Sequence, residues 1–362
     1  MAFYVDWVEK LQATRKWLQD VKTQGVDPQN WSKRIGTLDY LNSSLTGKVI
    51  ETEMMGMSRS SQYMPVQIRY IPHKGTGNLV TTDSSFTCTA PDQRRDILQT
   101  VQPTLFASDK FEIGEDYVRQ NAEGGFGLQQ RLNKEFQDAM RVVRESIDAQ
   151  ILSKLNTNMG ANPAAGAGAG TYTALQLLQD SDGTINVAEF DTIVNHQQDN
   201  FSDGPIGVIG TGNYRKFVNR LIVGSANERL VDPIAMGRDY GQAFFLDHAT
   251  TAQLGNVNYV LAIYPGSAQF FSYLLNKGAD FQIDHGGLIK GTMPDPILPG
   301  LEYDYDLYYD RNCTVSNGTQ GAWVGRLWLN FDTWTIPEGA FGDTYGALND
   351  FNGIVGYNIT SA

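Results

Sequence analysis

The longest regular run of apolar positions begins near Gly125 and ends near Leu155. Apolar side chains recur in it every three or four residues, which is the period of an α-helix with one buried face. At 1.5 Å per residue such a helix is roughly 45 Å long. We predict that its other side, which carries Arg144 and Asp148 among its charged residues, faces water. The apolar positions are Leu128, Leu132, Phe136, Met140, Val143, Ile147, Ile151 and Leu155.

Shorter patterns before this helix predict one more helix and several strands. Residues 5–23 have an amphipathic helical period. Residues 66–71 and about 84–89 are predicted to form a hairpin with a glycine-rich tip at 74–78. A further extended run covers 96–113 and leads toward the long helix.

A run of glycine and alanine at 159–170 follows the long helix. Because these residues cannot build a packed core, the run marks the clearest domain boundary. After it, short apolar strands alternate with predicted helices, which is typical of a compact α/β module. The predicted strands are 206–209, 243–246 and 257–263, and the predicted helices are 186–200, 213–222 and 267–275.

The C-terminal part of the chain predicts a long β-hairpin. Leu301–Asp310 alternates between apolar or aromatic and acidic residues, which is the period of a half-buried strand, and 322–331 returns after a turn. Strands before and after the α/β module must share one sheet if each is to bury a face. We therefore predict that the module, residues 171–299, is inserted into a discontinuous domain that contains the long helix.

Composition narrows the classes of function. The 362 residues include 28 basic and 40 acidic side chains, and the formal net charge of −12 argues against a protein that clamps nucleic acid. The two cysteines, Cys88 and Cys313, fit neither a disulfide framework nor a zinc site. We find no secretory signal pattern and no apolar run near the ~20 residues of a membrane span, so we expect a soluble protein made in a reducing cytoplasm.

One stretch resembles part of a calcium-binding loop. Five residues fit positions of that pattern, but Leu178 stands where the first ligand belongs; they are Asp180, Asp182, Gly183, Ile185 and Glu189. An Asp-Gly turn before a capped helix is therefore the favoured interpretation, and calcium is not predicted.

Two other motifs also have a plain structural interpretation. Gly210 and Gly212 follow a strand as in a dinucleotide fingerprint, but Arg215 replaces the third glycine, so a capped helix start is favoured. His248 and His285 directly follow aspartates, and neighbours on a strand point to opposite faces, so neither pair forms a dyad. We expect all four histidines to be structural or surface residues: His73, His196, His248 and His285.

The acidic residues of the C-terminal hairpin are the strongest catalytic candidates. Glu302, Asp304 and Asp306 share one face of the predicted strand, about 7 Å apart from one to the next. That spacing suits paired carboxylates, so an α/β-hydrolase-like or sugar-active enzyme that uses Asp304 or Asp306 is one alternative. The residues across the strand are apolar or aromatic, and we favour a solvated outer face. We predict that the chain is not an enzyme and has no catalytic, cofactor-binding or metal-binding residues.

The order of the predicted elements resembles that of one protein family. The order is a short helix, an arm, a hairpin, a strand, a very long helix, a Gly/Ala break, an α/β module and a closing hairpin. The segments that carry the resemblance are Thr100–Gly114, Ser146–Leu152, Val208–Phe217 and Trp334–Phe341. This order resembles that of the major capsid proteins of tailed double-stranded DNA bacteriophages, the Hong Kong 97-like fold. The resemblance implies an α+β fold with an extended β-hairpin loop, a peripheral domain and an inserted α/β axial domain.

The resemblance also implies a structural role. The chain is expected to self-assemble into the hexamers and pentamers of an icosahedral phage head that encloses packaged double-stranded DNA. Its segments would be an N-terminal arm at 1–53, an extended loop at 54–92, a peripheral domain at 93–170 and 300–341 with a spine helix at about 125–156, an axial domain at 171–299 and a tail at 342–362.

A long arm and hairpin cannot bury their faces within one monomer, so neighbouring subunits are expected to complete them. Methionines suit such contacts because they adapt to different surroundings. The residues expected to contact neighbouring subunits are Trp7, Leu11, Met54, Met57, Tyr63, Tyr70, Lys74 and Asn78.

The same resemblance implies partners and a location. We expect a portal protein, a cement protein as an optional partner, and a separate scaffolding protein because only about 50 residues precede the loop. We expect neither sequence-specific nucleic-acid binding nor a membrane, with assembly in the host cytoplasm and the virion as the final location. The alternatives are an encapsulin-like compartment shell and another self-assembling phage structural protein.

Overall fold

The computed structural model contains helices and mostly antiparallel sheets, an α+β fold, in two compact units. Unit 1 comprises Met1–Ser32, Thr104–Ile147 and Ser272–Phe331, and unit 2 comprises Lys33–Pro103, Asp148–Phe271 and Asp332–Ala362. Among the described residues, no helix has a stretch apolar enough to cross a lipid bilayer. The structure describes residues 6–23, 35–43, 51–54, 66–70, 97–121, 126–158, 175–179, 193, 206–210, 242–247, 259–277, 282–283, 287–298, 300–314, 320–336 and 352–361.

Unit 1 is built on an antiparallel sheet with the strand order β10-β11-β12-β13-β4. The strand β4 pairs with β13 along its whole length, from Leu105 opposite Phe331 to Gly114 opposite Ala322. This pairing confirms that strands on either side of the inserted module share one sheet. The strands are β4 (Leu105–Gly114), β10 (Gln282–Ile283), β11 (Ile289–Pro294), β12 (Glu302–Thr314) and β13 (Gln320–Thr335).

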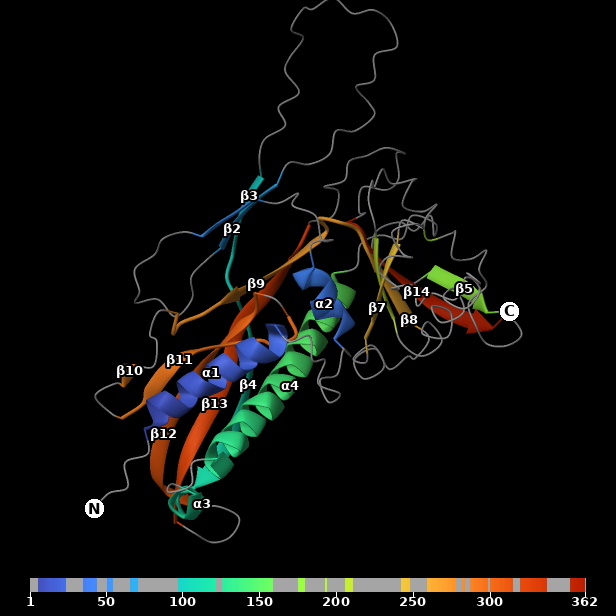
Figure 1. Cartoon of the computed structure of the whole chain (residues 1–362). Helices are drawn as coiled ribbons and strands as arrows, with labels where there is room; N and C mark the ends of the chain where they lie inside the picture. The colour runs from blue at the N-terminus through green and yellow to red at the C-terminus, as the bar shows by residue number, and fades with distance from the viewer. Residues whose placement is uncertain are drawn as a thin grey trace, which may run out of the picture. The chain divides into compact units, whose positions relative to one another are not determined.

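Two helices lie side by side across this sheet, α1 (Trp7–Thr23) and the first two thirds of α4 (Phe126–Thr157), while the short α3 (Glu115–Asn121) follows β4 (Figure 1). Both long helices confirm their predictions, and all eight apolar positions predicted for α4 are buried. Phe111 of β4 meets Phe136 of α4 edge-on, with ring centroids 5.0 Å apart. Gly325 of β13 makes room for this contact, because a Cβ there would lie 2.2 Å from the Phe111 ring.

Unit 2 contains a small antiparallel sheet of β1 (Glu51–Met54), β2 (Val66–Tyr70) and β3 (Ile97–Val101), in that order. Ile68 of β2 is fully buried against Trp334 and Ile336. Trp334 also donates a hydrogen bond from Nε1 to Gln99 Oε1 at 2.9 Å. The strand predicted at 84–89 lies outside the described residues.

A second sheet of unit 2 has five strands in the order β5-β14-β8-β6-β7. The pairs β14–β5 and β6–β7 are parallel, while β8 runs antiparallel to β14 and β6. The strands predicted at 206–209, 243–246 and 257–263 are confirmed. The members are β5 (Leu175–Gln179), β6 (Ile206–Gly210), β7 (Gln242–Leu246), β8 (Tyr259–Ile263) and β14 (Ile354–Ser361).

Some sequence-based expectations differ from these elements. The helix predicted at 267–275 is wrong, because Ala268–Tyr273 forms strand β9, whose aromatic residues suit pairing with β13. Residues 272–299, expected in the axial segment, supply strands to unit 1. The expected tail at 342–362 contributes β14 to the five-stranded sheet, where it pairs with β5 on one side and β8 on the other. The helices predicted at 186–200 and 213–222 and the linker at 159–170 lie outside the described residues, apart from Ile193.

Candidate functional site

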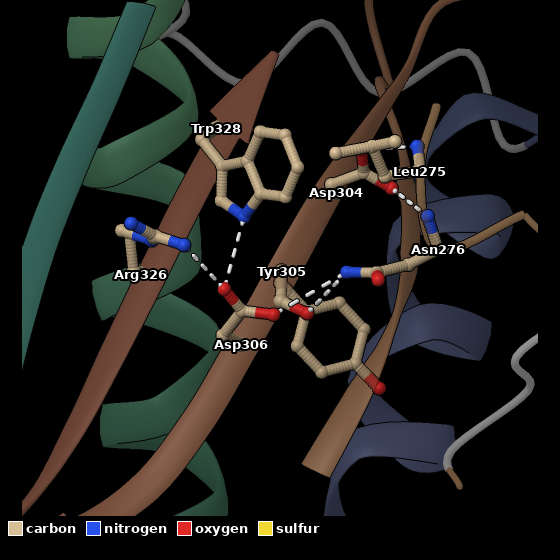
Figure 2. A network of polar contacts seen from close by, with 7 residues as sticks. All are labelled: Leu275, Asn276, Asp304, Tyr305, Asp306, Arg326 and Trp328. Atoms are coloured by element: carbon tan, nitrogen blue, oxygen red, sulfur yellow. Dashed lines mark hydrogen bonds and ion pairs between the residues drawn. The ribbon is translucent and has the colours of Figure 1, made fainter. Parts of the chain in front are cut away.

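Asp304 and Asp306 are two residues apart on β12 and stand on the same side of the sheet (Figure 2). Both are buried, with 0% and 8% of their surface exposed. The prediction of a solvated outer face is therefore wrong. The turn that follows β9 covers the two carboxylates, and the alternating pattern of β12 alone gives no sign of this cover.

Protein donors occupy the oxygens of both carboxylates (Figure 2). Asp304 accepts hydrogen bonds from the backbone N–H groups of Leu275 at 2.8 Å and Asn276 at 2.9 Å, one on each oxygen. Asp306 Oδ1 accepts one from Asn276 Nδ2 at 3.3 Å. Its Oδ2 accepts from Arg326 Nη2 at 2.6 Å and from Trp328 Nε1 at 3.2 Å.

The surroundings of Asp304 favour its neutral form more than water does. Burial raises the pKa of Asp304 to about 6, and the two backbone N–H groups oppose this rise. A raised carboxyl pKa is also a feature of catalytic acids, but here both carboxylates serve as acceptors that fasten one turn to one strand. The geometry of these two described carboxylates therefore supports a structural joint between the strand and the turn.

A second buried network lies between α4 and the β11–β12 turn. Arg144 is 1% exposed, and its Nε donates to Asp295 Oδ2 at 2.9 Å. Tyr303 donates its hydroxyl to the same oxygen at 2.7 Å, while Asp295 Oδ1 accepts from the backbone N–H groups of Ile297 and Leu298. The expectation that Arg144 faces water is wrong, because Asp295 gives it a buried partner.

The predicted contact residues Trp7 and Leu11 are inside unit 1, at 4% and 0% exposure. The ring centroids of Trp7 and Trp323 are 4.7 Å apart. Further along the helix, Thr14 donates its hydroxyl to Asn133 Oδ1 at 2.8 Å. In this structure α1 thus packs on its own chain, which corrects the expectation that Trp7 and Leu11 are left for a neighbouring subunit.

The other predicted contact residues belong to the small sheet and its connections. Met54 ends β1 opposite Val66, and Tyr70 ends β2 opposite Ile97. The remaining four lie outside the described residues: Met57, Tyr63, Lys74 and Asn78.

The other candidate motifs of the sequence fall largely outside the described residues. These are the calcium-like stretch, Gly212 with Arg215, and the four histidines. Within the described ranges, no cluster of three or more acidic, histidine or cysteine side chains could hold a metal ion.

No family model matches the chain, and none of the curated proteins does. Solved structures are similar to it over most of both chains, and three of them serve as examples. The Cyanophage A-1(L) capsid asymmetric unit is 12% identical over 93% of this chain and 96% of the other, with a TM-score of 0.47. The capsid of the native GTA particle is 10% identical over 83% and 86%, with a TM-score of 0.41. A structure of Mycobacterium phage Che8 is 9% identical over 85% and 92%, with a TM-score of 0.40.

Similarities at these identities and TM-scores leave the function to be inferred from the residues of the chain itself. Among those residues, Asn276 and Asp295 are the important ones that sequence reasoning missed. Each follows a short apolar stretch next to a turn, and only the fold brings them to Asp304 and Arg144.

Proposed function

We propose that this chain is the major capsid protein of a tailed double-stranded DNA bacteriophage, a structural subunit that self-assembles into the hexamers and pentamers of an icosahedral head. One observation carries the proposal. A 32-residue helix is backed by a sheet that joins β4, from before the inserted module, to β12 and β13, from after it. With the small β1-β2-β3 sheet ahead of β4, this is the element order that the family resemblance predicts.

The buried polar contacts support a role for unit 1 as a rigid frame. The Arg144–Asp295 pair joins α4 to the β11–β12 turn, and the Asp304–Asp306 network joins β12 to the turn after β9. Buried, hydrogen-bonded polar groups fix one arrangement of a fold, because any shift leaves a polar group without a partner. A shell subunit needs such rigidity because its neighbours are placed by its shape.

In this proposal the connections of the small sheet reach neighbouring subunits. They are residues 55–65, which include Met57 and Tyr63, and residues 71–96, which include Lys74 and Asn78. A sheet of three short strands has too little surface to bury both connections on its own. The helices α1 and α2 (Gly36–Asn42) are not needed for this role, since both pack on their own chain.

The segment names of the family follow as part of the proposal. The parts of unit 1 at 104–147 and 272–331 correspond to the peripheral domain, and the five-stranded sheet corresponds to the axial domain. The acidic net charge of −12 suits a container wall that holds DNA without binding it tightly. A portal protein and a separate scaffolding protein are the proposed partners, with a cement protein as an optional one.

Assembly of the purified chain tests the proposal. We expect closed icosahedral particles in negative-stain microscopy when the chain is produced alone or with its scaffolding protein. A chain that stays monomeric at high concentration under both conditions would refute it. Particles that form and remain empty beside a portal and DNA-packaging machinery would favour the encapsulin-like alternative.

A loop replacement tests the role of the connections. Because Tyr70 and Ile97 are paired neighbours, an Asn-Gly turn can replace residues 71–96 without moving β2 or β3. We expect this variant to yield folded capsomers that do not close into particles. Its control is Lys134→Met, an exposed change on α4 that leaves the small sheet and residues 71–96 unchanged. Normal particles from the loop replacement would refute the role assigned to 71–96.

A further inference from the structure

Two buried acidic side chains hold the first turn of α2 in unit 2. Asp148 lies in α4 and Asp247 directly follows β7, and they are 1% and 2% exposed. Asp148 Oδ1 accepts a hydrogen bond from Leu38 N at 2.8 Å. Asp247 Oδ2 accepts one from Thr37 N at 3.0 Å and another from the Thr37 hydroxyl. The expectation that Asp148 faces water is wrong, because α2 covers it.

The rest of α2 fits closely between its neighbours in unit 2. The Tyr40 ring meets Phe245 of β7 edge-on, with centroids 5.3 Å apart, and its hydroxyl donates to the carbonyl of Ile263 at 3.1 Å. Gly207 of β6 lies directly against the ring, since a Cβ there would be 2.3 Å from Tyr40 Cε2. The helix therefore has one well-defined docked position, and the protonation state of the two carboxyls decides whether that position is stable.

The second carboxyl oxygen of Asp148 is buried in the neighbourhood of another acid, Asp247. This oxygen, Oδ2, has no hydrogen-bond donor among the described residues. Burial, followed by the charge of Asp247 and more weakly that of Asp39, raises the pKa of Asp148 well above its usual range, and the Leu38 N–H opposes the rise. The nearest basic residue along α4, Arg144, is paired with Asp295.

A single shared proton resolves this arrangement. When the proton is bound to one carboxyl, that carboxyl donates a hydrogen bond to the other. This gives Asp148 Oδ2 a hydrogen-bond partner and removes the repulsion between the two negative charges. His248 is the next residue after Asp247 in the sequence and lies outside the described residues, so the test below includes it.

We infer that Asp148, Asp247 and the first turn of α2 form a protonation-dependent clasp: one proton held between the two carboxyls keeps α2 docked, and its loss favours release of the helix. The docked state binds the proton more tightly than the released state, in which both carboxyls meet water. The equilibrium constant for docking of α2 is therefore largest at low pH. It falls by about tenfold per pH unit between the ordinary pKa of an aspartate and the raised pKa of the docked pair. Release exposes Leu38, Tyr40 and Leu41, which are buried while α2 is docked.

Hydrogen exchange on the full-length protein tests the clasp. The measurement follows the amide protection of residues 36–42 from about pH 5 to about pH 9, corrected for the intrinsic pH dependence of exchange. Wild-type protection is expected to fall by about tenfold per pH unit over part of this range. In Asp148→Asn, the amide oxygen still accepts from Leu38 and the amide NH₂ donates to Asp247, so protection is expected to stay flat.

Further substitutions show which group holds the proton. In Asp247→Asn, the protection of residues 36–42 is also expected to be independent of pH. Asp138→Asn is the matched control: it lies beside Lys134 on the exposed side of α4 and should keep the wild-type curve of protection against pH. His248→Gln also keeps it, whereas a flat His248→Gln curve would move the proton to the imidazole and overturn the clasp. A curve that shifts on adding calcium chloride or EDTA would assign the site to a cation and overturn it as well.

Infrared spectroscopy of the wild-type protein tests the clasp even if the asparagine variants fail to fold. A buried protonated carboxyl absorbs apart from a carboxylate, and Asp304 contributes one such band that fades near its pKa of about 6. The clasp predicts a further band that is present at low pH and fades in step with the loss of α2 protection. Absence of that band throughout, or a wild-type protection that does not change with pH, would overturn the inference.

Discussion

Two successive turns of α4 bury charged residues in opposite ways. In unit 1, Arg144 meets Asp295, so the buried charges compensate each other. In unit 2, Asp148 meets Asp247, and two like groups share one environment. Burial on the same helix therefore does not decide how an ionisable residue behaves. The partner decides it: the first pair is a permanent joint, and the second depends on a proton.

The largest expected effect comes from removing the cation of the permanent joint. Arg144→Met keeps most of the side-chain volume but leaves Asp295 buried without its positive partner. Hydrogen bonds from Tyr303, Ile297 and Leu298 remain, yet an uncompensated buried charge costs about 3–5 kcal/mol of the free energy of unfolding. Urea unfolding followed by tryptophan fluorescence measures it, because five of the six tryptophans belong to unit 1.

A matched control is available on the exposed side of the same helix. Arg131 Nε is 3.5 Å from Glu135 Oε1, and Arg131 Cζ is 4.6 Å from the centre of the Tyr117 ring. The Arg131 side chain is 40% exposed. Arg131→Met is expected to cost no more than about 1 kcal/mol, because water screens such contacts. Equal losses in the two variants would remove the distinction between buried and exposed arginines on α4.

The next effect concerns pH and separates the two units further. Asp304 in unit 1 resembles Asp148 in that burial raises its pKa, to about 6. Because the folded state holds this proton more tightly, the contribution of Asp304 to stability is greatest in acid and falls as pH rises from about 4 to about 6, by about 2–3 kcal/mol. Asp304→Asn sets an amide NH₂ against a backbone N–H and is less stable throughout, but its pH slope should lack this contribution.

Urea unfolding of both proteins at several pH values provides the measurement. The slopes are compared, not the absolute stabilities, because the substitution has a cost of its own. An Asp304→Asn slope equal to that of the wild type would show that another group causes the response. The contribution of Asp304 is the wild-type slope minus the Asp304→Asn slope, and a difference of opposite sign would contradict the raised pKa itself.

The regular elements could be predicted from local patterns because their causes are local. The apolar period of α4 and the alternation of β12 each depend on neighbours within one segment. The strand β9 was missed because its apolar residues fit a helical spacing equally well, and only pairing with β13 decides between the two.

The buried charges could not be predicted for a different reason. Arg144 and Asp148 occupy positions on α4 that are polar in the sequence. The partner of Arg144, Asp295, is 151 residues away along the chain, and the backbone donor to Asp148, Leu38 N, is 110 residues away. Likewise, Asn276 lies 28 residues before Asp304 in a turn with no distinctive motif. A single sequence contains the residues of these networks but not the distances that join them.

The smallest effect tests whether compensated pairs behave alike in both units. Lys154, in the last turn of α4, pairs with the almost fully buried Asp332 within unit 2, and its side chain is 31% exposed. Lys154→Met should cost about 1–2 kcal/mol, less than Arg144→Met, because water reaches the pair and the Thr333 N–H still bonds Asp332. Lys134→Met, at an exposed pair with Asp138, is the control and should cost less than about 0.5 kcal/mol. A Lys154 effect as large as that of Arg144 would mean that the partner's burial, and not the access of water to the cation, sets the strength of these joints.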